Sequence, residues 1–152
     1  LVLWESNAIL GYIAAKADRA DLAPQTPRER ANVDRWLHWQ SAHYGAAIRK
    51  VAFERIVKKL AGLGAPDEAA IAQGIEEFEV AAKVLDDSLA GKDYVCDKLT
   101  IADFCLLPST AVAENCGLDL SVYPNARTWF GRMLARESVR RTLTDARRAQ
   151  PQ

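Results

Sequence analysis

The sequence has little charge imbalance and no long hydrophobic run, and each shortage excludes a class of protein. Its 152 residues include 20 basic and 20 acidic side chains, so the formal net charge is zero. A nucleic-acid-binding protein usually carries a positive footprint, and the balanced charge predicts no nucleic-acid partner. A membrane-spanning helix needs about 18 consecutive apolar residues. No run of that length occurs, so no membrane partner is expected.

Cysteine is also scarce, with Cys96, Cys105 and Cys116 as its three occurrences. The odd number and wide spacing fit neither a disulfide framework nor a zinc site. No Asn-x-Ser/Thr sequon and no secretory leader is visible, so a reducing cytoplasm is the expected location. Cys105 lies in an apolar stretch, which predicts an inert thiol in the core rather than a nucleophile.

The sequence does contain enough apolar material for a core, because 49% of its residues are hydrophobic and 26% are charged. Such a composition and length are typical of one folded domain. The chain opens on the apolar run Leu1–Trp4, where a domain usually begins with a polar end. We therefore expect that sequence upstream of Leu1 is missing, the alternative being a short chain with an apolar end.

Apolar residues recur at helical spacing almost throughout the chain. The pattern predicts helices over about 7–16, 28–60, 67–89, from 101, from 124, and over 137–148. Ser6 is the expected N-cap of the first, and Pro108 should kink the fourth. Residues 18–27 are polar, contain two prolines and indicate a linker. Six helices without a convincing internal strand predict an all-α bundle.

The segment Leu99–Phe104 carries the clearest local signal. Thr100 and Asp103 have the spacing of a capping box, in which each side chain accepts a backbone N–H from the other residue. The helix that follows is apolar all round, so its N-terminus cannot rely on water. This structural role explains both residues better than a catalytic or ligand role for Asp103. Losing either should cost about 0.5–2 kcal/mol.

Four segments in order resemble cytosolic glutathione S-transferases of the theta-like and bacterial types. They are Trp4–Ile13, Trp36–Gln40, Leu99–Phe104 and Tyr123–Phe130. The first is similar to the end of that family's thioredoxin-like domain, and the third is similar to its folding motif at the start of the core helix. The resemblance implies a glutathione S-transferase C-terminal-like helical bundle over 28–152. It also implies a linker over 18–27 and, over 1–17, a remnant of the thioredoxin-like domain with its last strand and helix.

In that family the catalytic Ser, Tyr or Cys lies near the start of the thioredoxin-like domain, which this chain does not contain. The catalytic residue is therefore unknown here and is expected upstream. We expect the chain by itself to be inactive or weakly active. A fragment, a wrongly assigned start and a natural truncation all remain open as explanations.

The resemblance assigns glutathione binding to Glu5 and Ser6. In such enzymes the Glu pairs with the α-amino group of the γ-glutamyl end, and the Ser holds the adjacent carboxylate. Elementary physics agrees, because helix N-termini bind anions through free N–H groups and the helix dipole. Without the resemblance, Ser6 would be read only as an N-cap and Glu5 only as a favourable first-turn charge.

The long second helix carries a candidate pocket for the hydrophobic co-substrate. His38, Ala42 and Arg49 share one helix face and could border it. The structural interpretation, which we prefer, is that the aromatic residues of this helix pack the bundle and that its histidines are ordinary surface or core groups. His38 and His43 are five residues apart, which is poor spacing for a metal site on a helix, so no metal is expected.

The C-terminal end is basic, with seven arginines against Glu137 and Asp145 from Pro124 onward. The arginines are Arg127, Arg132, Arg136, Arg140, Arg141, Arg147 and Arg148. Such an end could bind nucleic acid or anionic lipid. A solvated helix face that complements the acidic remainder of the chain is the more ordinary interpretation.

The implied activity is conjugation of the glutathione thiol to a hydrophobic electrophile. Glutathione would be a co-substrate, no other cofactor is expected, and the family resemblance implies a homodimer. The alternative is a non-catalytic binding or assembly module of the same fold. Glutathione affinity distinguishes the two.

Overall fold

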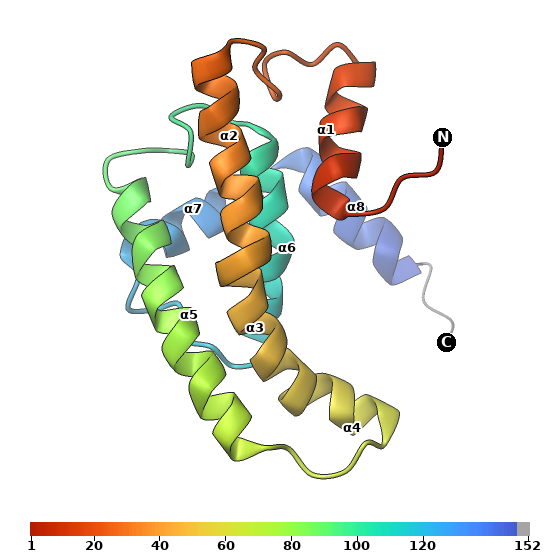
Figure 1. Ribbon diagram of the computed structural model, residues 1–152, viewed down its shortest axis with the longest axis vertical. Coiled ribbons are helices and arrows are strands. Elements are labelled where there is room, and N and C mark those ends of the chain that lie inside the picture. Colours follow the sequence, from red (N-terminus) through yellow and green to blue (C-terminus); the bar gives the residue numbers. More distant parts are fainter. Residues whose placement is uncertain (149–152) are drawn as a thin grey trace.

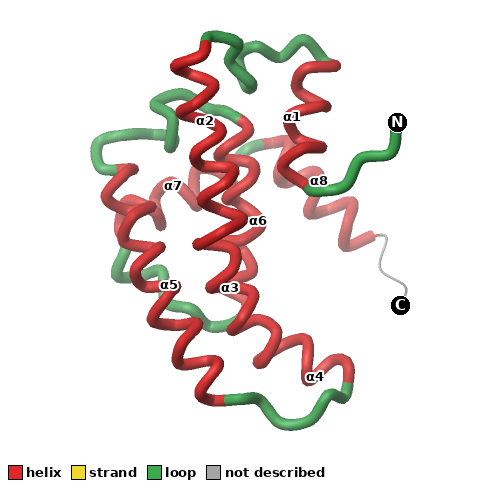
Figure 2. Tube along the Cα trace, in the orientation of Figure 1, coloured by secondary structure: helices red, strands yellow, loops and turns green. Residues whose placement is uncertain are grey.

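The computed structural model describes residues 1–148, and every regular element in this range is a helix (Figure 1). The helices are α1 (Ser6–Lys16), α2 (Pro27–Trp39), α3 (Gly45–Ala52), α4 (Lys58–Ala61), α5 (Glu68–Leu89), α6 (Ile101–Asn115), α7 (Pro124–Leu134) and α8 (Glu137–Arg148), with the π-helical segments η1 (Gln40–Tyr44) and η2 (Phe53–Val57). Figure 2 shows the same arrangement, with loops joining the helices and no strand among the described residues. The predicted all-α bundle is confirmed.

The long helix predicted over 28–60 forms as the continuous series α2, η1, α3, η2 and α4. Thr26 begins it, because its hydroxyl accepts the Glu29 N–H at 3.4 Å and Pro27 takes the first helical position. Gly62 ends it with a φ of 66°, a left-handed conformation that glycine adopts without strain. Leu60, near the end of this series, is 82% exposed and does not contribute to the core.

The core lies around α3, which packs against both α5 and α6. Ile48, Phe78 and Leu106 are buried there, and the Tyr44 hydroxyl lies 3.1 Å from the Thr110 hydroxyl. Gly74 of α5 lets the two long helices approach closely: a Cβ at this position would lie 2.7 Å from a Val51 methyl carbon. This close contact fixes α3 against α5. Helix α6 lies in the centre of the bundle (Figure 1).

The capping box at the start of α6 is confirmed. The Thr100 hydroxyl accepts the Ala102 N–H at 3.3 Å, and the Asp103 carboxylate accepts the Thr100 N–H at 3.0 Å. The same carboxylate also accepts the Trp129 indole N–H at 2.9 Å and the Val95 N–H at 3.2 Å. Burial raises the pKa of Asp103, and these hydrogen bonds act in the opposite direction. The box therefore holds the 90–100 loop and α7 as well as α6.

Two expectations about the first residues are wrong. The strand before α1 does not form in the described chain, because no other strand lies there to exchange backbone hydrogen bonds with Leu1–Trp4. Ser6 is the first residue of α1 rather than its N-cap. Glu5 occupies the N-cap position, and no side chain accepts a hydrogen bond from the N–H groups of the first turn.

In the described range, no helix is long and apolar enough to cross a membrane. The basic C-terminal helix forms as α8 over the predicted residues. The side chains of Asp145, Arg147 and Arg148 lie outside the part that the structure describes.

Candidate functional site

The N-terminus of α1 presents Glu5 and Ser6, both exposed, to solvent. Glu5 has φ 68° and ψ 111°, and its carbonyl accepts the Ile9 N–H at 3.0 Å. A positive φ is common for Asn and Asp but rare for Glu, and residues held in such conformations cluster at binding sites. The uncapped first-turn N–H groups can bind a carboxylate, and the Glu5 carboxylate beside them can bind an ammonium group.

Asn7 fastens this first turn to the helical domain. Its amide nitrogen lies 2.9 Å from the Leu37 carbonyl oxygen, 3.0 Å from the Ser41 hydroxyl and 3.3 Å from the Gln40 amide oxygen. All three acceptors lie at the junction of α2 with η1. No motif in the sequence points to Asn7 as a site residue. The feature that could have indicated its role is its position directly after the Glu5–Ser6 pair, because an Asn side chain there offers two N–H donors.

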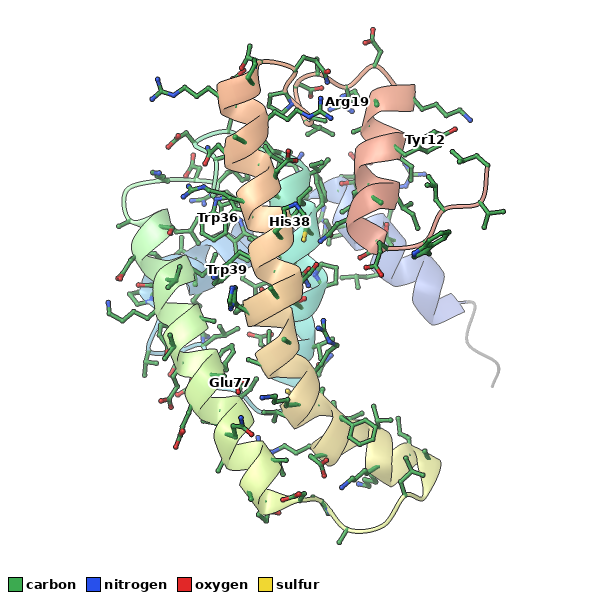
Figure 3. The ribbon with its side chains drawn as sticks, in the orientation of Figure 1. Tyr12, Arg19, Trp36, His38, Trp39 and Glu77 are labelled. Atoms are coloured by element: carbon green, nitrogen blue, oxygen red, sulfur yellow. The ribbon has the colours of Figure 1, made fainter. Side chains whose placement is uncertain are left out.

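A hollow of about 560 Å³ lies between α1 and α2, next to Glu5. Its lining includes Glu5, Asn7, Leu37, His38 and Ser41. Figure 3 shows His38 on α2, whereas Tyr12 lies on the side of α1 away from α2 and does not line the hollow. The hollow therefore gives the Glu5–Ser6 end of α1 a wall supplied by the long helix.

The structure does not bring together the three candidates for the co-substrate pocket. His38 lines the hollow beside α1, whereas Ala42 lines a second hollow between α2 and α5, with Trp39 and His43. Arg49 borders neither of these hollows, and its guanidinium donates to the Ser41 carbonyl at 3.2 Å. The passage of the helix through η1 widens its turn, so steps of four and seven residues do not give one shared face here.

The three thiols are poor nucleophiles. Burial raises the pKa of Cys105 to about 12, with the neighbouring Asn7 side chain acting the other way. The Cys105 thiol lies 3.4 Å from the Gln40 amide oxygen. Burial also raises the pKa of Cys96 and of Cys116. A thiol reacts as its thiolate, so none of them is activated at neutral pH. The expectation that Cys105 is buried in the core is confirmed.

Comparison with known proteins defines the class to which this bundle belongs. Residues 42–137 match the family described as "Glutathione S-transferase, C-terminal domain". The solved structure of glutathione S-transferase-I bound with lactoylglutathione superposes with a TM-score of 0.84 at 26% identity, over 93% of this chain and 68% of that one.

Two relatives resemble the chain over most of its length. Glutathione S-transferase GstB of Escherichia coli (strain K12) is 30% identical over 152 residues, covering 94% of this chain and 68% of that protein. FtsZ-localized protein A of Caulobacter vibrioides is 28% identical over 148 residues, covering 95% of this chain and 65% of that protein. The chain belongs to the glutathione S-transferase family.

Proposed function

We propose that the protein binds glutathione with its γ-glutamyl end at Glu5 and Ser6. The observation that carries the proposal is the uncapped N-terminus of α1, with Glu5 at its N-cap position at positive φ. The γ-glutamyl end carries an ammonium and a carboxylate on one carbon. The carboxylate would take the Ser6 hydroxyl and the first-turn N–H groups, and the ammonium would take Glu5. The glutathione derivative bound by the superposed transferase supports this choice of ligand.

The proposed reaction is transfer of the glutathione thiol sulfur to a hydrophobic electrophile. The thiol proton passes to a base or to solvent, and the sulfur attacks the electrophilic carbon as a thiolate. As the carbon–sulfur bond forms, that carbon either releases a leaving group with its bonding electron pair or, in an addition, opens a π bond whose other end then takes up a proton. None of the three cysteines of this chain could assist as a thiolate, because each is buried and has a raised pKa. We assign no residue of this chain to thiol activation.

His38 is the best placed of the three pocket candidates, because it lines the hollow that also contains Glu5. Ala42 and Arg49 lie outside that hollow. If this hollow receives part of the co-substrate, His38→Ala should raise the KM for the electrophile, and Arg49→Ala should not. An equal effect of both substitutions would contradict this assignment.

The glutathione proposal is tested by titration calorimetry. Glu5→Gln and Ser6→Ala should each weaken glutathione binding, by about tenfold for each charge-assisted contact that is lost. Glu76→Gln removes an exposed carboxylate on α5 and should leave the affinity unchanged. No measurable affinity in the unsubstituted protein, or equal affinity in all variants, would contradict the proposal.

A second candidate is a non-catalytic binding or assembly module. It is favoured by the relative FtsZ-localized protein A, whose name refers to localization with another protein. Exposed apolar side chains beside Trp39 also favour an assembly, since Val80 is 71% and Val84 is 43% exposed.

We propose that a second copy of the chain covers the face formed by Val80 and Val84 in a homodimer. Sedimentation should show a dimer that Val80→Asp weakens; an unchanged dimer would refute the assignment of the face.

A further inference from the structure

Asn7 connects the first turn of α1 to a part of the helical domain that is itself firmly held. Of its three acceptors, the Leu37 carbonyl also accepts the Gln40 N–H and the Ser41 hydroxyl, the latter at 3.2 Å. The Gln40 amide nitrogen donates to the Ser109 hydroxyl of α6 at 2.8 Å. The three acceptors are therefore held by the helical domain and do not move with α1. The Asn7 amide fixes the first turn of α1 against the junction of α2 and η1.

The π-helical turn explains why acceptors are available at this place. Across η1, the Gly45 N–H bonds to the Gln40 carbonyl, five residues back. A Cβ at Gly45 would lie 2.8 Å from that carbonyl oxygen, so this close approach depends on glycine. Turns of this kind are frequent at functional sites, because they redirect side chains and carbonyl groups. Here they direct Gln40 and Ser41 toward α1.

The Glu5–Ser6 pair needs such a fixed point. Glu5 stands outside the helix at positive φ, and no side chain caps the first turn that follows it. Helix ends without caps fray. A frayed first turn would separate the Glu5 carboxylate from the N–H groups of the turn, and a ligand with an ammonium and a carboxylate on one carbon could not engage both.

We infer that Asn7 is a positioning residue, which holds the first turn of α1 against the Leu37–Ser41 segment so that Glu5 and Ser6 together bind the γ-glutamyl end of glutathione. This inference rests on the proposed function. Asn7 need not touch the ligand, since its amide nitrogen is directed at the helical domain. Its contribution is to raise the fraction of molecules in which the site is assembled.

The size of the effect follows from that fraction. The apparent Kd equals the intrinsic Kd divided by the fraction of competent molecules. If loss of the Asn7 amide leaves the first turn formed in about one molecule in ten, the Kd for glutathione rises about tenfold.

The test compares Asn7→Ala with Asn125→Ala in the same protein. Asn125 is a matched control: its amide nitrogen also joins two helices, donating to the Asp86 carboxylate of α5 at 3.1 Å from the start of α7. Two quantities are measured, the glutathione Kd by calorimetry and hydrogen exchange of the backbone amides of residues 5–12. Asn7→Ala should raise the Kd about tenfold and speed the exchange, whereas Asn125→Ala should change neither. Ser41→Ala removes one acceptor and should give a smaller change in the same direction.

Each other outcome overturns the inference in a distinguishable way. An unchanged Kd in Asn7→Ala and Ser41→Ala, with binding by the unsubstituted protein intact, would overturn the positioning role and leave the proposed function standing. A raised Kd without faster exchange would show that Asn7 contacts glutathione directly. If the unsubstituted protein does not bind glutathione, the proposed function fails and this inference fails with it.

Discussion

The substitution Asp103→Ala should be among the most destabilising in the chain, and its cost can be worked from the structure. The Asp103 carboxylate accepts three buried N–H groups: those of Thr100 at 3.0 Å, Val95 at 3.2 Å and the Trp129 indole at 2.9 Å. These three partners are 1% exposed or less. Alanine leaves all three donors buried and unpaired, because water cannot reach them.

A buried donor that loses its acceptor costs about 1–3 kcal/mol. Three such donors in one network are not additive, since partial rearrangement relieves some of the cost. We therefore expect Asp103→Ala to lower the free energy of unfolding by about 3–5 kcal/mol. That is a large part of the roughly 5–15 kcal/mol by which a domain of this size is stable.

Asp103→Asn is the informative companion variant. One amide oxygen can still accept the Val95 and Trp129 donors, while the amide nitrogen faces the Thr100 N–H. The expected cost is therefore only about 1–2 kcal/mol, that of a lost cap. Urea unfolding followed by circular dichroism measures both variants. A cost below about 1 kcal/mol for Asp103→Ala, or equal costs for the two variants, would refute the reasoning.

Three further predictions test other parts of the account. Gly74→Ala places a Cβ 2.7 Å from a side chain of α3 and should lower the free energy of unfolding by about 1–3 kcal/mol. A Cβ at Gly131 has nothing within 4 Å, so the control variant Gly131→Ala should not lower it. The urea midpoints of the two variants measure the difference in stability. The Lys58 ammonium lowers the pKa of Glu54, so the stability that this pair contributes is present above the ordinary Glu pKa and lost as the pH falls through the lowered value. Glu54→Gln should accordingly be less stable than the unsubstituted protein at pH 7, with the difference closing in acid; a difference independent of pH would contradict the pairing. Iodoacetamide at neutral pH should leave Cys105 unmodified in the native protein and alkylate it after unfolding, which mass spectrometry measures. Rapid labelling of the native protein would contradict the raised pKa of about 12.

Periodicity and local capping chemistry were enough to predict most of the fold. The helices over 67–89 and 137–148 form at those residues to within one position, because Asp67 caps the first and the turn before Glu137 ends α7. The capping box at Thr100 and Asp103 was readable because both partners lie within four residues. Its larger role was not readable, because Val95 and Trp129 reach Asp103 only in the folded chain.

The site was less predictable for the same reason. Local sequence places Glu5 and Ser6 at a helix start, but it assigns the cap to Ser6, and the positive φ of Glu5 moves the start by one residue. The grouping of His38, Ala42 and Arg49 assumed a regular α-helix. The π-helical turn at Gln40–Tyr44 is invisible to a 3.6-residue period, and it places His38 and Ala42 on separate hollows.

The central claim is that the N-terminus of α1 recognises the γ-glutamyl end of glutathione. Comparing glutathione with cysteinylglycine, which lacks the γ-glutamyl group, tests it most directly by calorimetry. The account predicts that the unsubstituted protein binds glutathione at least tenfold more tightly, roughly the contribution of one charge-assisted contact, and that Glu5→Gln combined with Ser6→Ala removes this preference. Equal affinity for the two peptides in the unsubstituted protein, or a preference that survives both substitutions, would contradict it.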